Sequence, residues 1–346
     1  MDFGGGDEIR FERIGHAGVV TLTRPNALNA LTHDMVRALA RALAAWEDDA
    51  AVAFVLVKGE GRAFCAGGDI MQVYAARGSG QPAPVGFFAD EYRLNVHIQR
   101  YKKPYVALID GIVMGGGVGI SFHGSHRLLT ENAQFAMPEV GIGFFPDVGG
   151  SHILPPLGGF GMYVALTGNR IGPGDALGCG LATHAVKAAE QEKLIEGLVR
   201  EENPDTVLCD FSTSRERELD EATLAAIGRH FTLPSLDAVV SSLDGAVDDD
   251  FAARSLSTIR SRSPTSLAVA FRQIRAGQGL SMAECMNMEF RILNRMLDGH
   301  DFYEGIRAAI VDKDRQPKWR PARLEDVEAA VIDAYFAPLG DRELGL

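Results

Sequence analysis

Short apolar runs alternate with helical patterns over the first two hundred residues, and this alternation constrains the fold more than any other feature of the chain. Residues 19–23, 53–57 and 105–109 are each typical of a strand. From Thr32, a candidate N-cap, apolar residues recur on one helix face, at Val36, Leu39, Leu43 and Trp46. Strands that alternate with helices predict an α/β fold in which helices cover a sheet.

The pattern changes near Asn203 and Pro204. No clear strand run follows, and helical patterns dominate over residues 235–243, 249–262, 266–276, 282–297 and 324–336. We therefore expect a core domain over residues 1–202 and an all-helical region over 203–346, a division that suits a chain of 346 residues. A Gly/Pro-rich stretch at residues 77–84 predicts a surface loop.

The charge of the chain limits its partners. With 34 basic and 46 acidic residues, the formal net charge is −12, which argues against nucleic acid as a partner. Any polyanionic ligand would need a local basic patch set against this charge. Apolar residues make up 46% of the chain, which is enough for a sizeable core.

Cysteine usage and the N-terminal sequence bear on location. The four cysteines form no Cys-x-x-Cys pair and no disulfide framework, which favours a reducing compartment. The N-terminal residues are charged and glycine-rich, without the apolar segment of a secretory signal. No run approaches the ~18 apolar residues of a membrane span. We expect a cytoplasmic protein that does not cross a membrane.

Two glycine-rich segments each follow a predicted strand. AFCAGGD, at residues 63–69, presents backbone N–H groups at a sharp turn, although alone it is more typical of a strand-to-helix turn with Asp69 as N-cap. MGGGVG, at residues 114–119, opens a helical pattern, but neither a dinucleotide fingerprint nor a Walker A loop fits its register. An N–H donor at a helix start remains, which suits an oxyanion at least as well as a phosphate.

A third segment, FAMPEVGIGFFPDVGG at residues 135–150, holds two acids, Glu139 and Asp147, in apolar surroundings. Such carboxyls often have raised pKa values and take part in chemistry, but each could equally cap a helix or pair with an arginine.

Other candidate catalytic or metal-binding residues are weaker. His123 and His126 have no acid or cysteine at ligand spacing, so we expect no metal. Cys65 is better explained as a small buried residue than as a nucleophile, and no Gly-x-Ser-x-Gly elbow occurs.

Taken together, the three segments resemble the crotonase (enoyl-CoA hydratase/isomerase) superfamily. The resemblance implies a spiral of ββα units, and an oxyanion hole for a thioester carbonyl formed by the backbone N–H groups of Gly68 and Gly116. RPNALN, at residues 24–29, is similar to the family's CoA-contacting segment, so Arg24 and Asp69 become candidates for substrate binding. CoA then enters as part of the substrate, and no separate cofactor is implied.

The resemblance can be narrowed. Hydratases of this superfamily use two glutamates, but Gly119 stands where the first is expected, and only Glu139 matches the second. Asp147 and the C-terminal motifs SPTS at 263–266 and GHDFYEGIRA at 299–308 are instead similar to the 3-hydroxyisobutyryl-CoA hydrolase branch. Glu91 matches a substrate-contacting glutamate of that branch. The resemblance thus extends over nearly the whole chain and implies thioester hydrolysis.

The resemblance assigns roles but leaves alternatives open. Glu139 acts either as a nucleophile or as a general base. Asp147 orients the attacking group or protonates the leaving thiolate, and Glu91 accepts a hydrogen bond from a 3-hydroxyl group. Lys318 and Arg320 join Arg24 as candidates for the CoA phosphates. Two other functions remain open: a hydratase or isomerase that uses Glu139 alone, and a non-catalytic acyl-CoA binding protein. Self-association is open as well.

Overall fold

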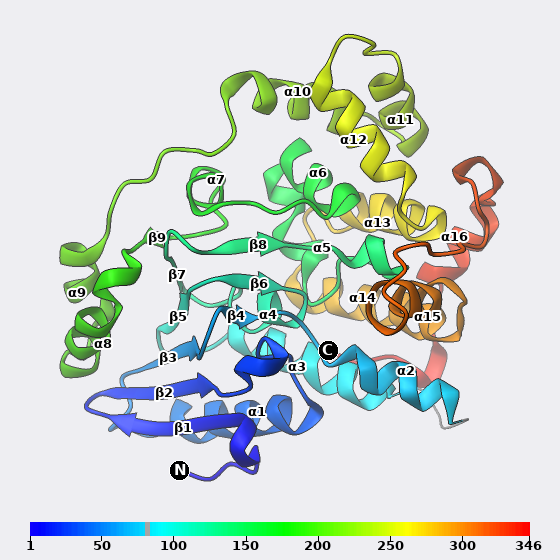
Figure 1. Ribbon diagram of the computed structural model, residues 1–346. Coiled ribbons are helices and arrows are strands. Elements are labelled where there is room, and N and C mark those ends of the chain that lie inside the picture. The colour runs from blue at the N-terminus through cyan, green and yellow to red at the C-terminus, as the bar shows by residue number, and fades with distance from the viewer. Residues whose placement is uncertain (80–83) are drawn as a thin grey trace. The chain divides into compact units, whose positions relative to one another are not determined.

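The computed structural model describes residues 1–79 and 84–346 (Figure 1). The chain forms two compact units. The first unit comprises Met1–Asp69, Gly86–Phe135 and Ile171–Glu218, and the second comprises Ile70–Val85, Ala136–Arg170 and Leu219–Leu346. Each unit is thus assembled from three separate stretches of the chain. The expected division into residues 1–202 and 203–346 stays a prediction. Half of the predicted loop at 77–84, residues 80–83, lies outside the described residues, and its first two residues are helical, since they end α2 (Ile70–Gly78).

Two sheets organise the first unit. The strands are β1 (Ile9–Ile14), β2 (Ala17–Leu22), β3 (Phe54–Gly59), β4 (Ala63–Cys65), β5 (Tyr105–Ile109), β6 (Ile112–Met114), β7 (His126–Leu129), β8 (Gln134–Ala136) and β9 (His184–Ala185). The larger sheet has the order β1-β2-β3-β5-β7-β9, and the smaller one has the order β4-β6-β8. In the larger sheet, β2, β3, β5, β7 and β9 run parallel to one another, and β1 is antiparallel to β2.

The strand order explains how a spiral of ββα units arises. Beginning with β3 and β4, the first strand of each pair joins the larger sheet and the second joins the smaller one. Parallel neighbours need a crossover connection, which the helices provide. The helices of this unit are α1 (His33–Glu47), α3 (Val85–Gln99), α4 (Gly116–Gly119), α7 (Pro173–Gly178), α8 (Gln191–Arg200) and α9 (Pro204–Phe211). The predicted α/β class and ββα arrangement are confirmed.

Alternation along the strands sets the core of the first unit. Val19, Leu56 and Leu108 point to one face of the larger sheet and pack against Leu194 and Leu198 of α8. The predicted strands match β2, β3 and β5 closely.

The helix predicted after Thr32 is α1. The Thr32 side chain accepts a hydrogen bond from the Met35 N–H at 3.3 Å, as an N-cap should. The four apolar residues predicted for its inner face, Val36, Leu39, Leu43 and Trp46, are all buried. This helix is therefore confirmed together with its cap.

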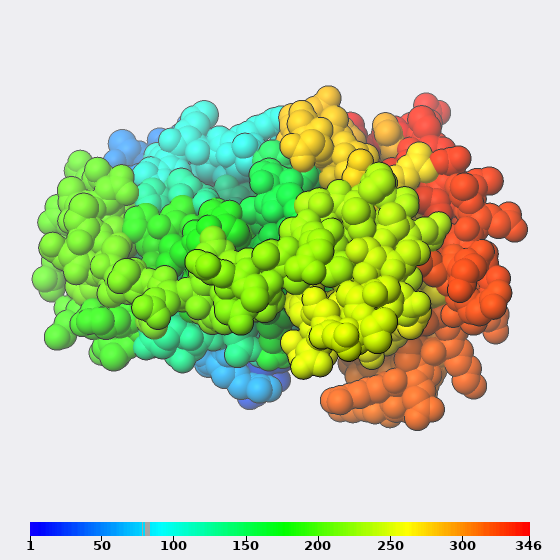
Figure 2. Space-filling model, turned by 90° about the horizontal axis from the view of Figure 1, so that it is seen from above, coloured from blue at the N-terminus to red at the C-terminus, as the bar shows by residue number. Residues whose placement is uncertain are grey.

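Helices dominate the second unit. They are α2 (Ile70–Gly78), α5 (Gly150–Ile153), α6 (Gly159–Thr167), α10 (Glu221–Phe231), α11 (Leu236–Asp244), α12 (Asp250–Arg260), α13 (Pro264–Ala276), α14 (Met282–Asp298), α15 (Asp301–Ile306) and α16 (Ala329–Phe336). Figure 2 shows the adjoining surfaces of α11 and α12 in yellow-green and yellow. Among the described residues no strand follows β9, which confirms the helical C-terminal region.

One predicted helix is wrong in extent. Residues 324–336 were expected to form a single helix, but a 3-10 turn (Leu324–Asp326) and α16 are separated there by Val327 and Glu328, which have extended backbones. The sequence patterns did not locate α2, α3, α5, α6, α7, α8, α9, α10 and α15. In the part of the chain that the structure describes, no helix is both long and apolar enough to span a membrane.

Candidate active site

The predicted site residues fall in both compact units. Gly68, Gly116 and Glu91 belong to the first unit, together with Arg24 and Asp69, whereas Glu139 and Asp147 belong to the second. That all of them line one pocket stays a prediction.

The turn after β4 directs one backbone amide away from its neighbours. Gly68 forms a short parallel bridge with Leu31, in which the Leu31 N–H donates to the Gly67 oxygen at 2.8 Å and the Asp69 N–H donates to the Leu31 oxygen at 2.9 Å. These two hydrogen bonds use the backbone groups of Gly67 and Asp69, the residues on either side of Gly68. The N–H of Gly68 itself therefore points away from Leu31. Within the described residues, the Gly68 N–H donates no hydrogen bond.

The glycine-rich start of α4 lies against this turn. A Cβ atom on Gly116 would stand 3.3 Å from the Gly68 nitrogen, and one on Gly117 would stand 2.3 Å from the Cys65 oxygen. Because side chains would clash, only glycines allow this approach. Two backbone amides of the first unit, those of Gly68 and Gly116, are therefore neighbours. Their role as an oxyanion hole stays a prediction.

Helix α3 adds polar side chains to the same place. Glu91 is only 2% exposed, and its Oε1 lies 2.5 Å from where a Gly116 Cβ would be. Asn95, one turn further on, is fully buried, and neither polar atom of its side chain has a hydrogen-bond partner among the described residues. An unsatisfied buried amide is costly, so the polar atoms of Asn95 call for a partner that the described residues do not supply. Sequence reasoning singled out Glu91 but missed Asn95, although the i, i+4 spacing was visible.

Arg24 and Asp69 are bound to each other. The Arg24 guanidinium pairs with Asp69 Oδ2 at 3.1 Å and with Glu8 Oε1 at 3.1 Å, and it also donates to the Ala30 oxygen at 2.5 Å. These contacts hold the segment that follows β2 against the turn after β4. The structure thus gives Arg24 a local role, and its contact with CoA stays a prediction.

In the second unit, Glu139 lies in an apolar setting. It begins a 3-10 turn (Glu139–Ile142), is 6% exposed, and its Oε2 has no hydrogen-bond partner among the described residues. Burial raises the pKa of Glu139 well above its usual range, and the nearby charges of Asp147 and Glu289 raise it further. A carboxyl of this kind holds its proton to a higher pH than an exposed glutamate does.

Asp147 follows Glu139 by eight residues and is 5% exposed. The segment between the two acids bends back through Gly143, whose φ is +72°. Phe144 and Phe145 on this segment are buried and form an apolar wall, in which the Phe144 ring stacks on Phe302 with centroids 4.4 Å apart. The chain thus brings the charges of the two acids close enough to raise the pKa of Glu139.

Helix α15 explains part of the C-terminal motif. A Cβ on Gly143 would stand 2.2 Å from the Asp301 oxygen, and one on Gly305 would stand 2.2 Å from the Ile142 oxygen. The backbones of the acid-bearing segment and of α15 therefore touch, which requires glycine on both sides. Asp301 also accepts a hydrogen bond from Ser263 at 2.7 Å, which joins the two C-terminal motifs.

Several weaker candidates take structural roles. Burial raises the pKa of the Cys65 thiol to about 12, so it is not a nucleophile at neutral pH. His126 pairs with Asp205 at 2.9 Å. Among the described residues no cluster of His, Cys, Asp or Glu could hold a metal ion. Lys318 and Arg320 are exposed, and their contact with phosphates stays a prediction.

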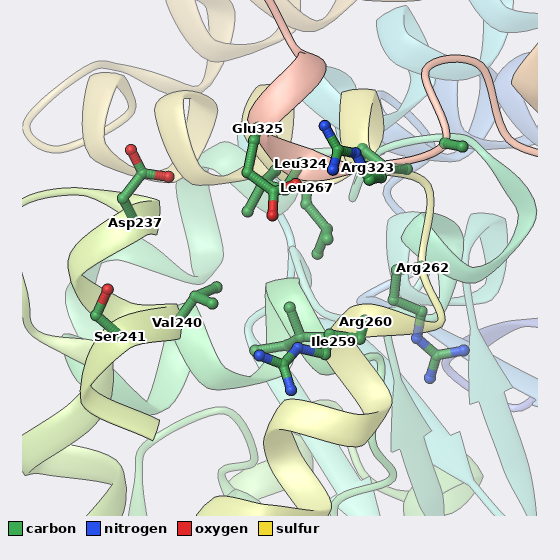
Figure 3. Close-up of a pocket in the computed structure, with 12 residues that line it drawn as sticks. Asp237, Val240, Ser241, Ile259, Arg260, Arg262, Leu267, Arg323, Leu324 and Glu325 are labelled. Atoms are coloured by element: carbon green, nitrogen blue, oxygen red, sulfur yellow. The ribbon is translucent and has the colours of Figure 1, made fainter. Parts of the chain in front are cut away.

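A cavity of about 470 Å³ in the second unit lies between α11, α12, α13 and the 3-10 turn before α16 (Figure 3). None of the predicted site residues line it. Its arginines are engaged: Arg260 pairs with Asp244 at 3.0 Å, Arg323 pairs with Asp326 at 2.9 Å, and Arg262 donates to the Thr167 oxygen. The two acids that line the cavity, Asp237 and Glu325, are exposed, unlike the buried Glu139.

Sequence reasoning also missed Glu289 and Gln273. Both are fully buried and contact the loop that carries Asp147. The signal was present in the predicted helix at 282–297, because Glu289 falls three residues after Met286 and seven after Met282, on the apolar face. A charged residue on the buried stripe of a helix calls for a partner.

The family model described as enoyl-CoA hydratase/isomerase matches residues 17–336. Curated relatives are similar over nearly the full chain. The 3-hydroxyisobutyryl-CoA hydrolase, mitochondrial, of Danio rerio is 44% identical, with 99% of this chain and 92% of the relative covered. The protein of the same name from Homo sapiens is 40% identical, with 98% and 90% covered.

Two solved structures are also similar. A carnitinyl-CoA dehydratase from Mycobacterium thermoresistibile has a TM-score of 0.92 at 39% identity, with 98% of each chain covered. An enoyl-CoA hydratase from Rhodobacter sphaeroides 2.4.1 has a TM-score of 0.88 at 38% identity, with 98% of this chain and 100% of that chain covered. These similarities confirm the crotonase fold.

The comparison overturns the expected location. The curated relatives are named mitochondrial, so the expectation of a cytoplasmic protein is wrong, and the names point to the mitochondrion instead. The expectation rested on a missing apolar segment and on unpaired cysteines. Mitochondrial transit peptides are amphipathic and arginine-rich rather than apolar, so the first of these observations does not separate the two compartments.

Proposed function

The chain belongs to the enoyl-CoA hydratase/isomerase family, and from this premise we propose that it hydrolyses a short branched 3-hydroxyacyl-CoA. The substrate that fits best is 3-hydroxyisobutyryl-CoA, which water converts to 3-hydroxyisobutyrate and free CoA. This reaction is a step of valine degradation. The names of the curated relatives support the choice of substrate.

One observation carries the proposal: Glu139 and Asp147 are two buried acids whose charges interact, and Glu139 has a pKa well above its usual range. A pure binding protein needs no such pair. A two-glutamate hydratase would need an acid where this chain has Gly119. The pair supports attack of water on a carbonyl, either directly or through a covalent intermediate.

The reaction proceeds through an oxyanion. The thioester oxygen accepts hydrogen bonds from the N–H groups of Gly68 and Gly116 as attack builds negative charge on it. If Glu139 attacks, its carboxylate forms a mixed anhydride with the acyl group, CoA leaves as a thiolate, and water opens the anhydride. If Glu139 is a base, it takes a proton from the attacking water. Asp147 protonates the thiolate or orients the attacking group.

The 3-hydroxyl group gives the acyl part its specificity. Glu91 offers an acceptor for this hydroxyl beside the Gly116 backbone. A site built to hydrogen-bond a hydroxyl rejects analogues that lack it, because its polar groups are then left unsatisfied. We expect methacrylyl-CoA to be a poorer substrate for this reason.

A second candidate is a hydratase or dehydratase that uses Glu139 alone. The names of the two similar proteins of known structure, a dehydratase and a hydratase, favour it. A thiol-release assay separates the candidates, because hydrolysis liberates CoA-SH and hydration does not. The assay is run with 3-hydroxyisobutyryl-CoA, 3-hydroxypropionyl-CoA, methacrylyl-CoA and crotonyl-CoA. Thiol release that is fastest with a 3-hydroxyacyl substrate supports the proposal, and conversion of crotonyl-CoA without thiol release contradicts it.

A further inference from the structure

A buried carboxyl outside the predicted site holds the loop that carries Asp147. Glu289 lies on α14 and is fully buried. Its Oε2 accepts a hydrogen bond from the Gly149 N–H at 2.9 Å, and its Oε1 accepts one from the Ser151 N–H at 2.9 Å. The Ser151 hydroxyl also donates to Oε1. Three donors are what an ionised carboxylate needs to be tolerated in a protein interior.

A second side chain holds the other end of the same loop. Gln273 on α13 is fully buried, and its Nε2 donates to the Pro146 oxygen at 2.6 Å. Figure 1 shows α13 and α14 beside the short helix α5, which follows the loop. Asp147 is thus anchored on both sides by residues from two C-terminal helices.

The backbone between these anchors has a conformation that needs support. Val148 has a φ of +49°, and Gly149 has a φ of +88°. Glycine adopts positive φ freely, but a β-branched residue rarely does, and it persists there only when its surroundings enforce it. The hydrogen bonds from Gly149 and Ser151 to Glu289 provide that support immediately after the strained residue.

Glu289 also acts on the acids through its charge. Burial raises its pKa to about 7, against the hydrogen bonds from Ser151, Gly149 and Gln273, which lower it. Its charge is among the causes that raise the pKa of Glu139. Burial raises the pKa of the nearby Cys285 thiol to about 12, and the charge of Glu289 adds to this, so that thiol stays neutral.

We propose that Glu289 is a positioning residue of the active site, which fixes the place of Asp147 relative to Glu139 through the backbone of Gly149 and Ser151. The inference rests on the proposed function and adds a residue that touches neither the substrate nor the reacting atoms. The ionised form holds the loop, because a protonated carboxyl would present an O–H to groups that are themselves donors. Turnover therefore depends on Glu289, whereas binding of the CoA part does not.

The first test is Glu289→Gln, with kcat and KM measured by thiol release. The amide nitrogen of glutamine must face a backbone N–H, so one of the two backbone hydrogen bonds is lost. We expect kcat to fall about 10- to 100-fold, as small misplacements of catalytic groups do, while KM changes less than about 2-fold. Asp298→Asn, an exposed change on the same helix, should leave both constants unchanged. A raised KM with unchanged kcat, or an equal loss in Asp298→Asn, overturns the inference.

The second test is the pH profile of kcat/KM, which a merely structural role would not move. Glu289→Gln removes a negative charge near Glu139, so the acid limb of the profile should shift to lower pH. Ser151→Ala removes a hydrogen bond that lowers the pKa of Glu289, so Glu289 carries less negative charge at a given pH and the limb should again shift to lower pH, by less than in Glu289→Gln. Two shifts in this direction support the inference, and an unchanged limb in both variants overturns it. Ser151→Ala leaves both backbone hydrogen bonds in place and keeps the test open if Glu289→Gln does not fold.

A third measurement separates this inference from the proposed function. The carboxyl groups of protein labelled with ¹³C-glutamate are titrated by NMR, and the Glu139 signal is assigned with Glu139→Gln. If the wild-type protein releases no thiol from any acyl-CoA, the proposed function fails, but the titration still reports the coupling. We expect the pKa of Glu139 to be lower in Glu289→Gln than in wild type, and an unchanged value overturns the inference.

Discussion

The two units contribute different kinds of group to the predicted chemistry. The first unit offers backbone N–H groups, at Gly68 and Gly116, whose placement depends on the absence of side chains. The second unit offers side-chain carboxyls, Glu139 and Asp147, whose properties depend on burial and on neighbouring charge. The contribution of the first unit should therefore be lost when atoms are added at its glycines. The contribution of the second unit should be lost when the charge of its carboxyls is removed without a change of shape.

We expect the largest loss of kcat when a methyl group is added at Gly116 in the first unit. In Gly116→Ala, the new Cβ would stand 2.5 Å from Glu91 Oε1 and 3.3 Å from the Gly68 nitrogen. It would fill the space in front of the Gly68 N–H and displace Glu91. Loss of one oxyanion donor costs ~10²–10³ in kcat, which thiol-release kinetics would detect.

The control for this variant is Gly86→Ala on α3. Its Cβ would meet only His33, at 3.8 Å, an ordinary contact. It should keep wild-type kinetics and thermal stability. Near-wild-type turnover in Gly116→Ala, with the fold intact, would mean that these amides do not bind the oxyanion.

The role of the carboxyls in the second unit is tested by Glu139→Gln, which keeps the shape of the side chain but removes the carboxylate that would act as nucleophile or base. We expect kcat to fall at least ~10²-fold while CoA binding stays nearly intact. Glu328→Gln, the same chemical change at an exposed position of the second unit, serves as control. Wild-type hydrolysis by Glu139→Gln would make Glu139 a structural acid and remove the main chemical support for a hydrolase.

Asp147→Asn should have a smaller effect, because an amide still orients a neighbouring group by hydrogen bonding but cannot supply a readily lost proton. We expect kcat to fall by about 10-fold, which is less than the ~10²–10⁴-fold that positioned acid–base catalysis typically contributes. A substrate with a better leaving thiol should restore part of the rate if Asp147 protonates the thiolate. No rescue by such a substrate would leave orientation as its role.

The sequence predicted the residues that form motifs and missed those that support them. The motifs around Gly68, Gly116, Glu139 and Asp147 are local in sequence, so their spacing can be recognised directly. Glu289 contacts a loop almost 140 residues away in sequence, and no local pattern encodes that contact. A charged residue on the apolar face of a predicted helix indicated that Glu289 has a buried partner, but the sequence did not indicate which residue that partner is.

The same physical limit applies to the fold. Strands and the helix α1 were predicted because their apolar periodicity and caps are local. The helix expected at 324–336 was broken because Val327 and Glu328 are extended there, and periodicity does not report such an interruption. The glycines at positions 143 and 305 looked like turn or motif residues, but they allow two backbones to touch, which only the folded chain shows.

The acids of the second unit also predict a cost in stability. Because the folded-state pKa of Glu139 is raised, the folded protein keeps a proton that the unfolded chain releases, so stability falls as pH rises from about 4.5 toward the folded pKa. Glu139→Gln lacks this loss. The gain in free energy of unfolding of Glu139→Gln relative to wild type should therefore be larger at pH 8 than at pH 5. Urea unfolding at pH 5 and pH 8 measures this, and an equal difference at both pH values would contradict it.

The smallest expected effect concerns the CoA phosphates, which neither half accounts for. Lys318 and Arg320 are exposed in a chain of net charge −12, so their attraction for phosphate should be weak and screened by salt. We expect Lys318→Ala and Arg320→Ala each to weaken CoA binding by about 2- to 5-fold at low salt, and by less at high salt, as the ~10 Å Debye length at 0.1 M implies. Lys193→Ala, an exposed lysine of α8, is the matched control and should have no effect. Calorimetric titration of CoA over a range of salt concentrations measures both. Affinity for CoA that did not change with salt would mean that the phosphates are held by buried groups or by backbone amides. The CoA phosphates would then be bound in the same way as the thioester oxygen, for which the first unit is predicted to supply backbone amides.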